Sequence, residues 1–377
     1  MKTRVGVIGG GIAGASAAYY LTKENKELEV ILIEAENQLG IHTTGRSAAL
    51  LLENDGTAST RSIVKASVNF LRNPPVELTQ NAFVRPRPVM HLATREQSKS
   101  MDRLIRENYS GSIPTREIST KEAKIRFPPL NEEKIDRVAI DEGSGDIDVH
   151  ELHQSYLKGF RQNGGQIKAS SRVDSVTKKR NSWKLETTDG NVSVDLIVNA
   201  SGAWGDVVAE RANIKPVGLE PRRRTAFTVN KSEIDPRDWA MITDIDLRFY
   251  VKPDGMQLLC SLGEENPSEP CDAKPEEIDV ALAIKRINSA TTLEIHNVHT
   301  AWTGLRTFVT DRSMVIGPDP DVDNFFWCVG QGGTGIMTSP GAGKLLSDFV
   351  NFGHPSSHFD QTGLDADDIS PFRFRKK

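Results

Sequence analysis

Residues 4–34 read RVGVIGGGIAGASAAYYLTKENKELEVILIE, and this stretch decides the fold. An apolar run leads into Gly9, Gly11 and Gly14, which have the spacing G-x-G-x-x-G, and a small-residue segment follows. A second apolar run then ends at Glu34. This order predicts a strand, a helix and a second strand, which together form the βαβ unit that binds a dinucleotide.

Each residue of this pattern has a physical reason. Gly9 permits the tight turn out of the strand, Gly11 lets the backbone approach a pyrophosphate, and Gly14 lets the helix pack against the sheet. The helix N-terminus offers free N–H groups and a positive dipole end to the phosphate. The carboxylate of Glu34 lies where ribose hydroxyls are bound.

Length and composition exclude several classes of protein. A chain of 377 residues with 37% hydrophobic and 26% charged residues predicts a globular protein with two lobes. The formal net charge of -4 argues against nucleic acid as a partner. Only Cys260, Cys271 and Cys328 occur, without close pairing, which fits a reducing compartment. With no room for a signal peptide before the first strand and no apolar run of membrane-spanning length, we expect a cytoplasmic protein without an integral membrane segment.

The rest of the chain contains further motifs. Prolines punctuate residues 73–141, which predicts an insertion that belongs to a second lobe and contains a charged helix at 95–108. A helix is predicted at 149–163 and a buried strand at 195–199. Residues 330–335 repeat the glycine spacing without a following acid, so we expect a helix N-terminus directed at the first cofactor rather than a second dinucleotide site.

Metal binding is not predicted. His150 and His153 share a helix face but have no third ligand nearby, and His296 and His299 would point to opposite faces of a strand. Solvated or core histidines explain these residues.

Five motifs together carry a resemblance: the βαβ unit, HTTGRSAA at 42–49, VNASGAW at 198–204, WTGLRTF at 302–308 and GQGGTGI at 330–336. The chain resembles the FAD-dependent D-amino-acid oxidase and glycine oxidase superfamily, with a particular likeness to the D-arginine dehydrogenase type. The resemblance covers nearly the whole chain. It implies an α/β fold with a Rossmann-like FAD-binding domain in three layers (ββα) and a second α+β substrate domain on a mixed or antiparallel sheet.

The resemblance also implies domain boundaries and a cofactor site. Residues 1–75, 142–215 and 300–377 would form the FAD-binding domain, and residues 76–141 and 216–299 the substrate-binding domain. FAD would be bound non-covalently, because no cysteine stands where some relatives attach flavin. The residues that match the family's cofactor site are Gly9, Gly11, Ile12, Ala13, Gly14, Glu34, Ala35, His42, Thr43, Thr44, Gly45, Arg46, Ser47, Ala48, Val173, Ser201, Gly202, Trp204, Gly332, Gly333, Thr334, Gly335, Ile336 and Met337.

The substrate carboxylate in this family is held by arginine and tyrosine. Arg306, Tyr250 and Arg223 match those positions, and Gly333 in the glycine loop belongs to the catalytic set. A guanidinium pairs with a carboxylate through two parallel hydrogen bonds, which fixes its position and angle. Since alternate residues share a strand face, Arg222 and Arg224 would point away from Arg223. A surface strand arginine remains the alternative for Arg306 and for Arg223.

The side-chain pocket departs from the D-arginine type. Val89 replaces a glutamate that pairs with the basic side chain, and Leu50 and Asp55 replace the histidine and tyrosine of the lid. An arginine substrate would leave a buried charge unpaired beside Val89, so we expect a neutral or apolar side chain. Asp55 keeps a basic substrate possible.

The implied reaction is oxidation of the CH–NH2 group of a small-molecule amino acid, expected to be a D-amino acid. Hydride transfer to flavin N5 gives an imino acid, which water converts to a 2-oxo acid and ammonia. An electron acceptor, either oxygen, a quinone or another molecule, would reoxidise the flavin. One alternative is a 2-hydroxyacid dehydrogenase, which needs a base, and no histidine is clearly placed for it. The second alternative is a non-catalytic FAD-containing subunit.

Overall fold

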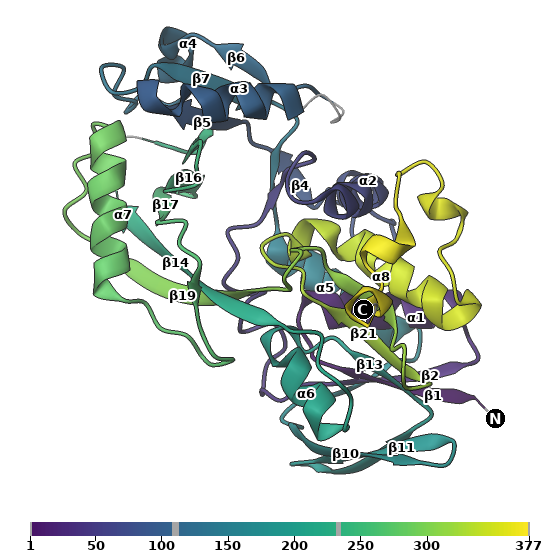
Figure 1. Cartoon of the computed structure of the whole chain (residues 1–377). Coiled ribbons are helices and arrows are strands. Elements are labelled where there is room, and N and C mark those ends of the chain that lie inside the picture. Colours follow the sequence, from purple (N-terminus) through teal and green to yellow (C-terminus); the bar gives the residue numbers. More distant parts are fainter. Residues whose placement is uncertain (1, 108–112, 231–234, 376–377) are drawn as a thin grey trace.

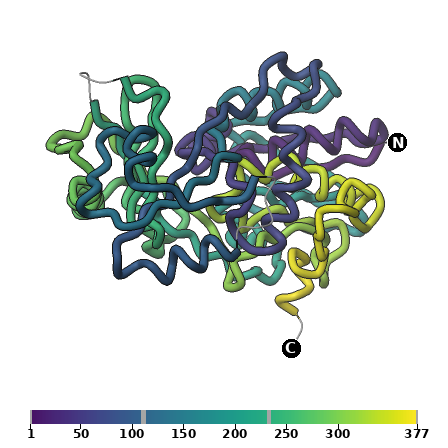
Figure 2. Tube along the Cα trace, turned by 90° about the horizontal axis from the view of Figure 1, so that it is seen from above, coloured from purple at the N-terminus to yellow at the C-terminus, as the bar shows by residue number. Residues whose placement is uncertain are grey.

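The computed structural model describes residues 2–107, 113–230 and 235–375. Two lobes make up the chain (Figure 1), and the long strands β14 (Glu220–Asn230) and β19 (Thr300–Phe308) run between them. Figure 2 shows the same division from above, because the blue and green stretches gather at one end and the purple and yellow stretches at the other. Segments far apart in sequence therefore build each lobe.

A six-stranded sheet forms the centre of the first lobe. Its central strand β1 (Thr3–Ile8) pairs in parallel with β2 and with β13, and β2 pairs in parallel with β9. The strand order is β20 (Val315–Pro318), β21 (Phe325–Val329), β13 (Leu196–Asn199), β1, β2 (Leu28–Ile33) and β9 (Gln166–Lys168). The carboxyl ends of β1, β2 and β13 thus lie side by side, where a doubly wound sheet binds its ligands.

Layers cover both faces of this sheet. The helices of one layer are α1 (Ile12–Glu24), α2 (Ala58–Arg72), α5 (Val149–Gln162) and α8 (Gly335–Phe352). The other layer consists of α6 (Gly205–Arg211) and a three-stranded sheet of β10 (Val173–Lys179), β11 (Ser182–Thr187) and β12 (Gly190–Val194). A separate buried apolar core fills each side. This is the three-layer ββα arrangement that the sequence predicts.

Glycines let the helices of the first layer approach one another. A Cβ at Gly343 of α8 would lie 2.7 Å from Ser16 Oγ of α1, and one at Gly341 would lie 2.7 Å from the Ile63 carbonyl of α2. Helix α8 therefore packs closely against both α1 and α2, and its N-terminus lies beside that of α1, because a Cβ at Gly335 would lie 3.8 Å from Ile12 Cγ2.

The second lobe is built on a nine-stranded sheet. Apart from β19, which pairs with β14, the order is β18 (Asn266–Pro267), β14, β17 (Gln257–Ser261), β16 (Tyr250–Asp254), β15 (Met241–Asp244), β5 (Val89–Ala93), β7 (Arg137–Asp141) and β6 (Arg116–Ile118). Only β15 and β5 pair in parallel among the pairings described for this sheet. Helices α4 (Thr120–Arg126) and α7 (Glu277–Ala290) flank the core on one face. At the β5 and β7 end, the opposite face is covered by η1 (Arg95–Gln97) and α3 (Ser98–Glu107).

Short elements complete the fold. β3 (Leu50–Leu51), β8 (Gly145–Ile147) and β4 (Val84–Pro86) form a small sheet at the junction of the lobes. The remaining short helices are η2 (Gly202–Trp204), η3 (Ser357–Phe359), η4 (Ala366–Asp368) and η5 (Pro371–Phe374). Among the described residues, no helix has the length and apolar character needed to cross a membrane.

The predicted domain boundary at residue 300 needs one correction. We assigned residues 300–377 to the FAD-binding domain, but β19 pairs along its whole length with β14 of the nine-stranded sheet. Residues 300–308 therefore belong to the sheet of the second lobe. The predicted helix at 95–108 is observed as η1 and α3 up to Glu107, and residue 108 lies outside the described residues.

Candidate functional site

A cavity of about 950 Å³ lies between the two lobes. One end is formed by the carboxyl ends of β1, β2 and β13, and the other by one face of the nine-stranded sheet. Polar and apolar groups from both lobes line the same space. Such a cleft at the strand ends of an α/β sheet is the usual place for a cofactor and its substrate.

The first glycine loop leaves no room for side chains. Gly9 has a φ of +108°. A Cβ at Gly14 would lie 1.8 Å from the Gly9 carbonyl oxygen, so α1 packs directly on the turn. Thr44 Oγ1 accepts a hydrogen bond of 2.9 Å from the Ile12 N–H, which joins the helix N-terminus to the loop that follows β2. Gly14 is thus a packing residue and not part of the cavity wall, whereas Gly9 and Gly11 line the cavity.

Glu34 ends β2 at the cavity. Its carboxylate accepts hydrogen bonds from the N–H groups of Gly10, at 2.7 Å, and Glu36, at 2.9 Å. These two bonds fix the carboxylate and leave lone pairs for the hydroxyls of a ribose. The pattern of glycines and acid therefore fits the adenosine half of FAD.

The loop at 42–48 joins the two lobes. Thr43 Oγ1 donates to the Leu305 carbonyl at 2.8 Å, and Arg46 Nη1 donates to the Thr303 carbonyl at 2.8 Å, both on β19. His42 Nε2 lies 2.9 Å from Glu36 Oε1, while its Nδ1 is buried and has no partner among the described residues. A buried ring nitrogen without a partner at this wall fits a site that a polar cofactor completes.

The structure brings most of the predicted cofactor residues to this cavity. Gly14, Gly45 and Thr334 do not line it; Gly45 closes a turn through an N–H bond of 2.7 Å to the Gly40 carbonyl, and Thr334 is the residue before α8. The predicted residues that line it are Gly9, Gly11, Ile12, Ala13, Glu34, Ala35, His42, Thr43, Thr44, Arg46, Ser47, Ala48, Val173, Ser201, Gly202, Trp204, Gly332, Gly333, Gly335, Ile336 and Met337.

The second glycine loop supports Arg306. Gly330 and Gly332 have φ values of +75° and +55°, and the Gly332 N–H donates to the Thr307 carbonyl at 2.8 Å. A Cβ at Gly333 would lie 1.7 Å from Arg306 Nη2, so only glycine leaves space for this guanidinium. Helix α8 begins two residues later, at Gly335, and its N-terminus faces the same cavity.

Arg306, Arg224 and Tyr250 line the cavity together. Burial lowers the pKa of Arg306 to about 10, and the charge of Arg224 acts in the same direction. Arg224 donates through Nε to the Glu264 carbonyl at 2.8 Å. Two cationic side chains and a phenol thus converge on one region of the wall, which is the chemistry that binds a carboxylate.

One carboxylate of the chain already contacts these arginines. Glu265 Oε1 lies 3.2 Å from Arg306 Nη1 and 3.6 Å from an Arg224 nitrogen, and both Glu265 oxygens accept from Arg312 at 2.9 and 3.0 Å. Burial opposes ionisation of Glu265, but the bonds to Arg312 and the neighbouring charges hold its pKa below the usual value. Arg306, Arg224 and Arg312 carry three positive charges against one from Glu265, so the group keeps an excess of positive charge that favours binding of a further carboxylate.

Arg223 is a correction to the predicted site. Among the described residues it is not part of the cavity lining. It lies on the opposite face of β14, where it pairs with Glu276 and, at 2.6 Å, with Asp279 Oδ2 of α7. The expected alternation of faces is observed, because Arg222 and Arg224 lie in register with Arg306 and Gly304. The face was misassigned, and Arg224 occupies the place that we predicted for Arg223.

Val89, Asp55 and Leu50, which we predicted for the substrate side chain, all line the cavity. The structure adds His91 on β5, Asp141 on β7, and Met241 and Thr243 on β15. The alternation of side chains along β5 would have indicated His91 once Val89 was placed on the inner face. Asp141, Met241 and Thr243 could not be found in this way, because the pairing of β7, β5 and β15 is not encoded locally.

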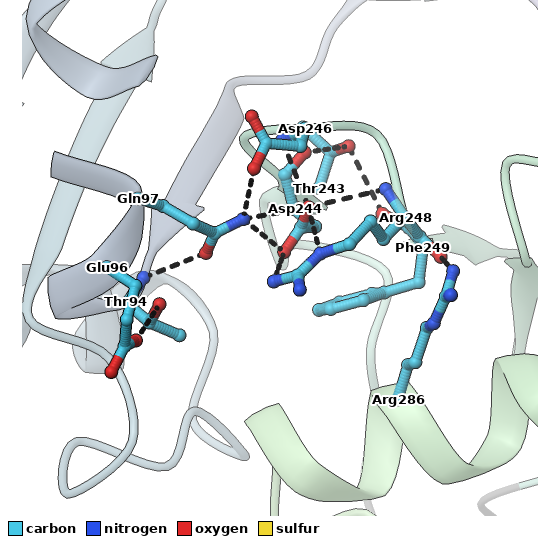
Figure 3. A network of polar contacts seen from close by, with 9 residues as sticks. All are labelled: Thr94, Glu96, Gln97, Thr243, Asp244, Asp246, Arg248, Phe249 and Arg286. Atoms are coloured by element: carbon cyan, nitrogen blue, oxygen red, sulfur yellow. Dashed lines mark hydrogen bonds and ion pairs between the residues drawn. The ribbon is translucent and has the colours of Figure 1, made fainter. Parts of the chain in front are cut away.

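A polar network positions the turn between β15 and β16 (Figure 3). The buried carboxylate of Asp244 accepts from Gln97 Nε2 at 3.1 Å and from Arg248 Nη2 at 2.7 Å, and Gln97 also donates to Asp246 at 2.7 Å. Because Gln97 belongs to η1, the network ties the segment after β5 to this turn. The turn presents Leu247 and, just after it, Tyr250 to the cavity.

The described residues contain no group of three or more His, Cys, Asp or Glu side chains arranged to hold a metal ion. His153 is buried and bonds through Nε2 to the Gly10 carbonyl at 2.9 Å. None of Cys260, Cys271 and Cys328 lines the cavity.

Comparisons with known proteins agree with this geometry. The model of a family described as FAD dependent oxidoreductase matches residues 4–349. The mouse "FAD-dependent oxidoreductase domain-containing protein 1" is 24% identical over 98% of this chain and 84% of its own length. Rat "Dimethylglycine dehydrogenase, mitochondrial" is 26% identical over 95% of this chain, which spans only 44% of that protein.

The fold has relatives among solved structures. L-proline dehydrogenase from P. horikoshii superposes with a TM-score of 0.85 at 20% identity, over 99% of this chain and 98% of that one. The family match extends from β1 through most of α8 and so includes both glycine loops, Arg224 and Arg306. The chain belongs to the FAD-dependent oxidoreductase family, and FAD is its cofactor.

Proposed function

We propose that the protein oxidises the CH–NH2 group of an amino acid, giving an imino acid and then a 2-oxo acid and ammonia. The observation that carries the proposal is that Arg306, Arg224 and Tyr250 face the cavity that also contains the nucleotide-binding loop. The similar proteins named above include dehydrogenases of dimethylglycine and of L-proline, which supports an amino acid as substrate.

The residues of the chain bind and orient the substrate. Arg306 and Arg224 hold the carboxylate, and Tyr250 offers a phenolic hydrogen bond. FAD, held by the glycine loop at Gly9 and Gly11 and by Glu34, would supply the hydride acceptor for oxidation at the substrate Cα. The N-terminus of α8 at Gly335 brings positive dipole to the cavity and favours negative charge there.

The substrate is proposed to be a D-amino acid with a neutral or apolar side chain. The D configuration follows from the motif resemblance. Val89 is buried, with 1% of its surface exposed, and offers no charge to a basic side chain. Asp55 lines the cavity, and its negative charge acts on Arg306.

Oxidation of 2-hydroxy acids is the second candidate, and one observation favours it. Such a reaction needs a base for the hydroxyl proton, and the structure places His91 in the cavity. The same arginines would hold the carboxylate.

The test is anaerobic bleaching of the purified flavoprotein by a panel of D-amino, L-amino and 2-hydroxy acids. We expect fast bleaching by amino acids with neutral side chains. Bleaching by 2-hydroxy acids alone would replace the proposal with the second candidate, and no bleaching by any compound would favour a non-catalytic FAD-containing subunit. Reoxidation by oxygen or by a quinone then identifies the class of acceptor. The cytoplasmic location remains part of the proposal and is supported by three free cysteines.

A further inference from the structure

His91 stands on the inner face of β5. The strand alternates, because Met90 and Leu92 point into the core beneath the sheet while Val89 and His91 line the cavity. Leu104 of α3 also lines the cavity. The imidazole therefore lies on a strand that is separated from β14 by β17, β16 and β15, across the sheet from the arginines of β14 and β19.

The imidazole has no hydrogen-bonding partner among the residues that the structure describes. No hydrogen bond or ion pair to His91 is found within residues 2–107, 113–230 and 235–375, and burial alone lowers its pKa to about 4. At neutral pH the ring is thus uncharged, with one N–H donor and one acceptor nitrogen. His91 is half-buried in the cavity wall. A ligand that displaces water from this part of the wall must therefore supply the hydrogen bonds of the ring.

The distance from the carboxylate-binding residues suits an amino acid side chain. In the sheet, His91 pairs with Thr243, and Thr243 pairs with Tyr250. Two strand spacings separate the backbones of His91 and Tyr250, which is about 10 Å. Val89 and Met241 line the same part of the wall and are apolar. A side chain that extends from the carboxylate-binding residues across this wall would reach His91 with its end group.

None of the charged residues discussed below forms a hydrogen bond or an ion pair with His91. Asp141 accepts from the Gly143 N–H at 2.9 Å, and burial raises its pKa. Arg61 donates to the Gly56 carbonyl at 2.6 Å. Glu107 and Asp55 also line the cavity, but neither contributes to the pKa shift of His91. The imidazole itself therefore offers a neutral donor and acceptor, on the strand beside a carboxyl group, Asp141, whose pKa is raised by burial.

We propose that His91 determines specificity by hydrogen bonding to the end of the substrate side chain, so that the preferred amino acids carry an uncharged polar group such as an amide or a hydroxyl. This inference rests on the proposed function. It refines the neutral or apolar class to its polar members.

The experiment compares two probe substrates of nearly equal length, glutamine and methionine, in the enantiomer that bleaches the flavin. The measured quantity is the ratio of their kcat/KM values. In the wild-type holoprotein this ratio is expected to favour glutamine. His91→Met removes both hydrogen-bonding groups and should lower the ratio about tenfold or more, whereas His91→Gln keeps a donor and an acceptor and should retain most of it.

A matched control is His299→Leu, because His299 is exposed and does not line the cavity. It should leave the ratio unchanged. An equal ratio in wild type, His91→Met and His91→Gln would overturn the role of His91 while leaving amino acid oxidation intact. If His91→Met loses FAD or fails to fold, the wild-type protein still tests the inference. A kcat/KM in wild type that is higher for methionine than for glutamine would overturn it. Absence of bleaching by every amino acid is the different result that removes the proposed function.

Discussion

The two ends of the cavity differ in how their polar groups are satisfied. At the nucleotide end, groups of the chain bind one another: Thr44 caps the Ile12 N–H, and Glu34 accepts from two backbone N–H groups. At the substrate end, Arg306 and Arg224 exceed the charge of Glu265, and His91 has no partner among the described residues. The first end is largely preorganised by the fold, with His42 Nδ1 as the exception, while the second has more groups that only a ligand can pair.

This difference between the two ends predicts which mutations affect folding and which affect substrate binding. A change at the nucleotide end disturbs backbone packing and should cost FAD as well as stability. A change at the substrate end removes groups that the folded chain itself does not need, and should alter kinetics with FAD retained.

Gly14→Ala is expected to have the largest effect. The new Cβ would lie 1.8 Å from the Gly9 carbonyl oxygen, so the turn and α1 must separate. We expect loss of most of the bound FAD, measured by the ratio of flavin to protein absorbance after purification. The control is Gly353→Ala at the end of α8, where φ is +77° but no atom lies within 4 Å of the new Cβ. It should cost about 1 kcal/mol of unfolding free energy and keep the FAD. Full FAD content in Gly14→Ala would contradict the claim that close backbone packing maintains the nucleotide end.

Arg306→Ala is expected to have the second-largest effect. It removes the guanidinium that packs against Gly333 of the second glycine loop, and we expect the KM for the best amino acid to rise about 100-fold or more with FAD content unchanged. Arg306→Lys keeps the charge but loses the bidentate geometry, so its KM should lie between those of Arg306→Ala and wild type. An unchanged KM in Arg306→Ala would remove this residue from the carboxylate site.

Arg223 and Arg224, which are adjacent on β14, test which face of this strand lines the cavity. Arg224→Ala should raise KM about tenfold or more, because this side chain faces the cavity. Arg223→Ala should leave KM unchanged and lower the unfolding free energy by about 1–3 kcal/mol, because it leaves the buried carboxylate of Asp279 without its cation. Steady-state kinetics and denaturant unfolding on both variants separate the effects. The reverse pattern would restore the original assignment of Arg223.

The nucleotide end could be predicted from sequence because its contacts are local. Gly9, Gly11, Gly14 and Glu34 belong to one βαβ unit, and each answers a steric or hydrogen-bonding demand of its neighbours. The substrate wall is different. Arg223 and Arg224 are indistinguishable until the face of β14 that meets α7 is known, and His91 gains meaning only from its pairing with β15. The alternation of side chains along β14 predicts that only one of Arg223 and Arg224 faces the cavity. Tertiary packing decides which of the two it is.

Val89→Glu tests the side-chain end by adding a charge. Val89 is buried beside His91, and a carboxylate there would pair with a cationic side chain. We expect the kcat/KM for D-arginine or D-lysine to rise about tenfold, and that for neutral amino acids to fall. Val89→Gln has the same shape without the charge and should not improve the basic substrates. A decrease for both classes would mean that residue 89 does not face the substrate side chain.

The smallest expected effect is a difference between wild type and His91→Gln in how the unfolding free energy depends on pH. Its pKa is lowered from 6.5 to about 4 by burial, so between these values the unfolded chain binds a proton at this residue that the folded chain does not. The unfolding free energy therefore falls as pH decreases from 6.5 toward 4, and the contribution of His91 is fully present above pH 6.5. The loss should reach about 2–3 kcal/mol in wild type and be absent from His91→Gln, as measured by denaturant unfolding across this range. The pKa of His153 is also lowered by burial and acts in the same direction in both proteins, so it cancels in the difference. Equal slopes would show that His91 is solvated in the folded protein, and the substrate end would then be as well satisfied as the nucleotide end.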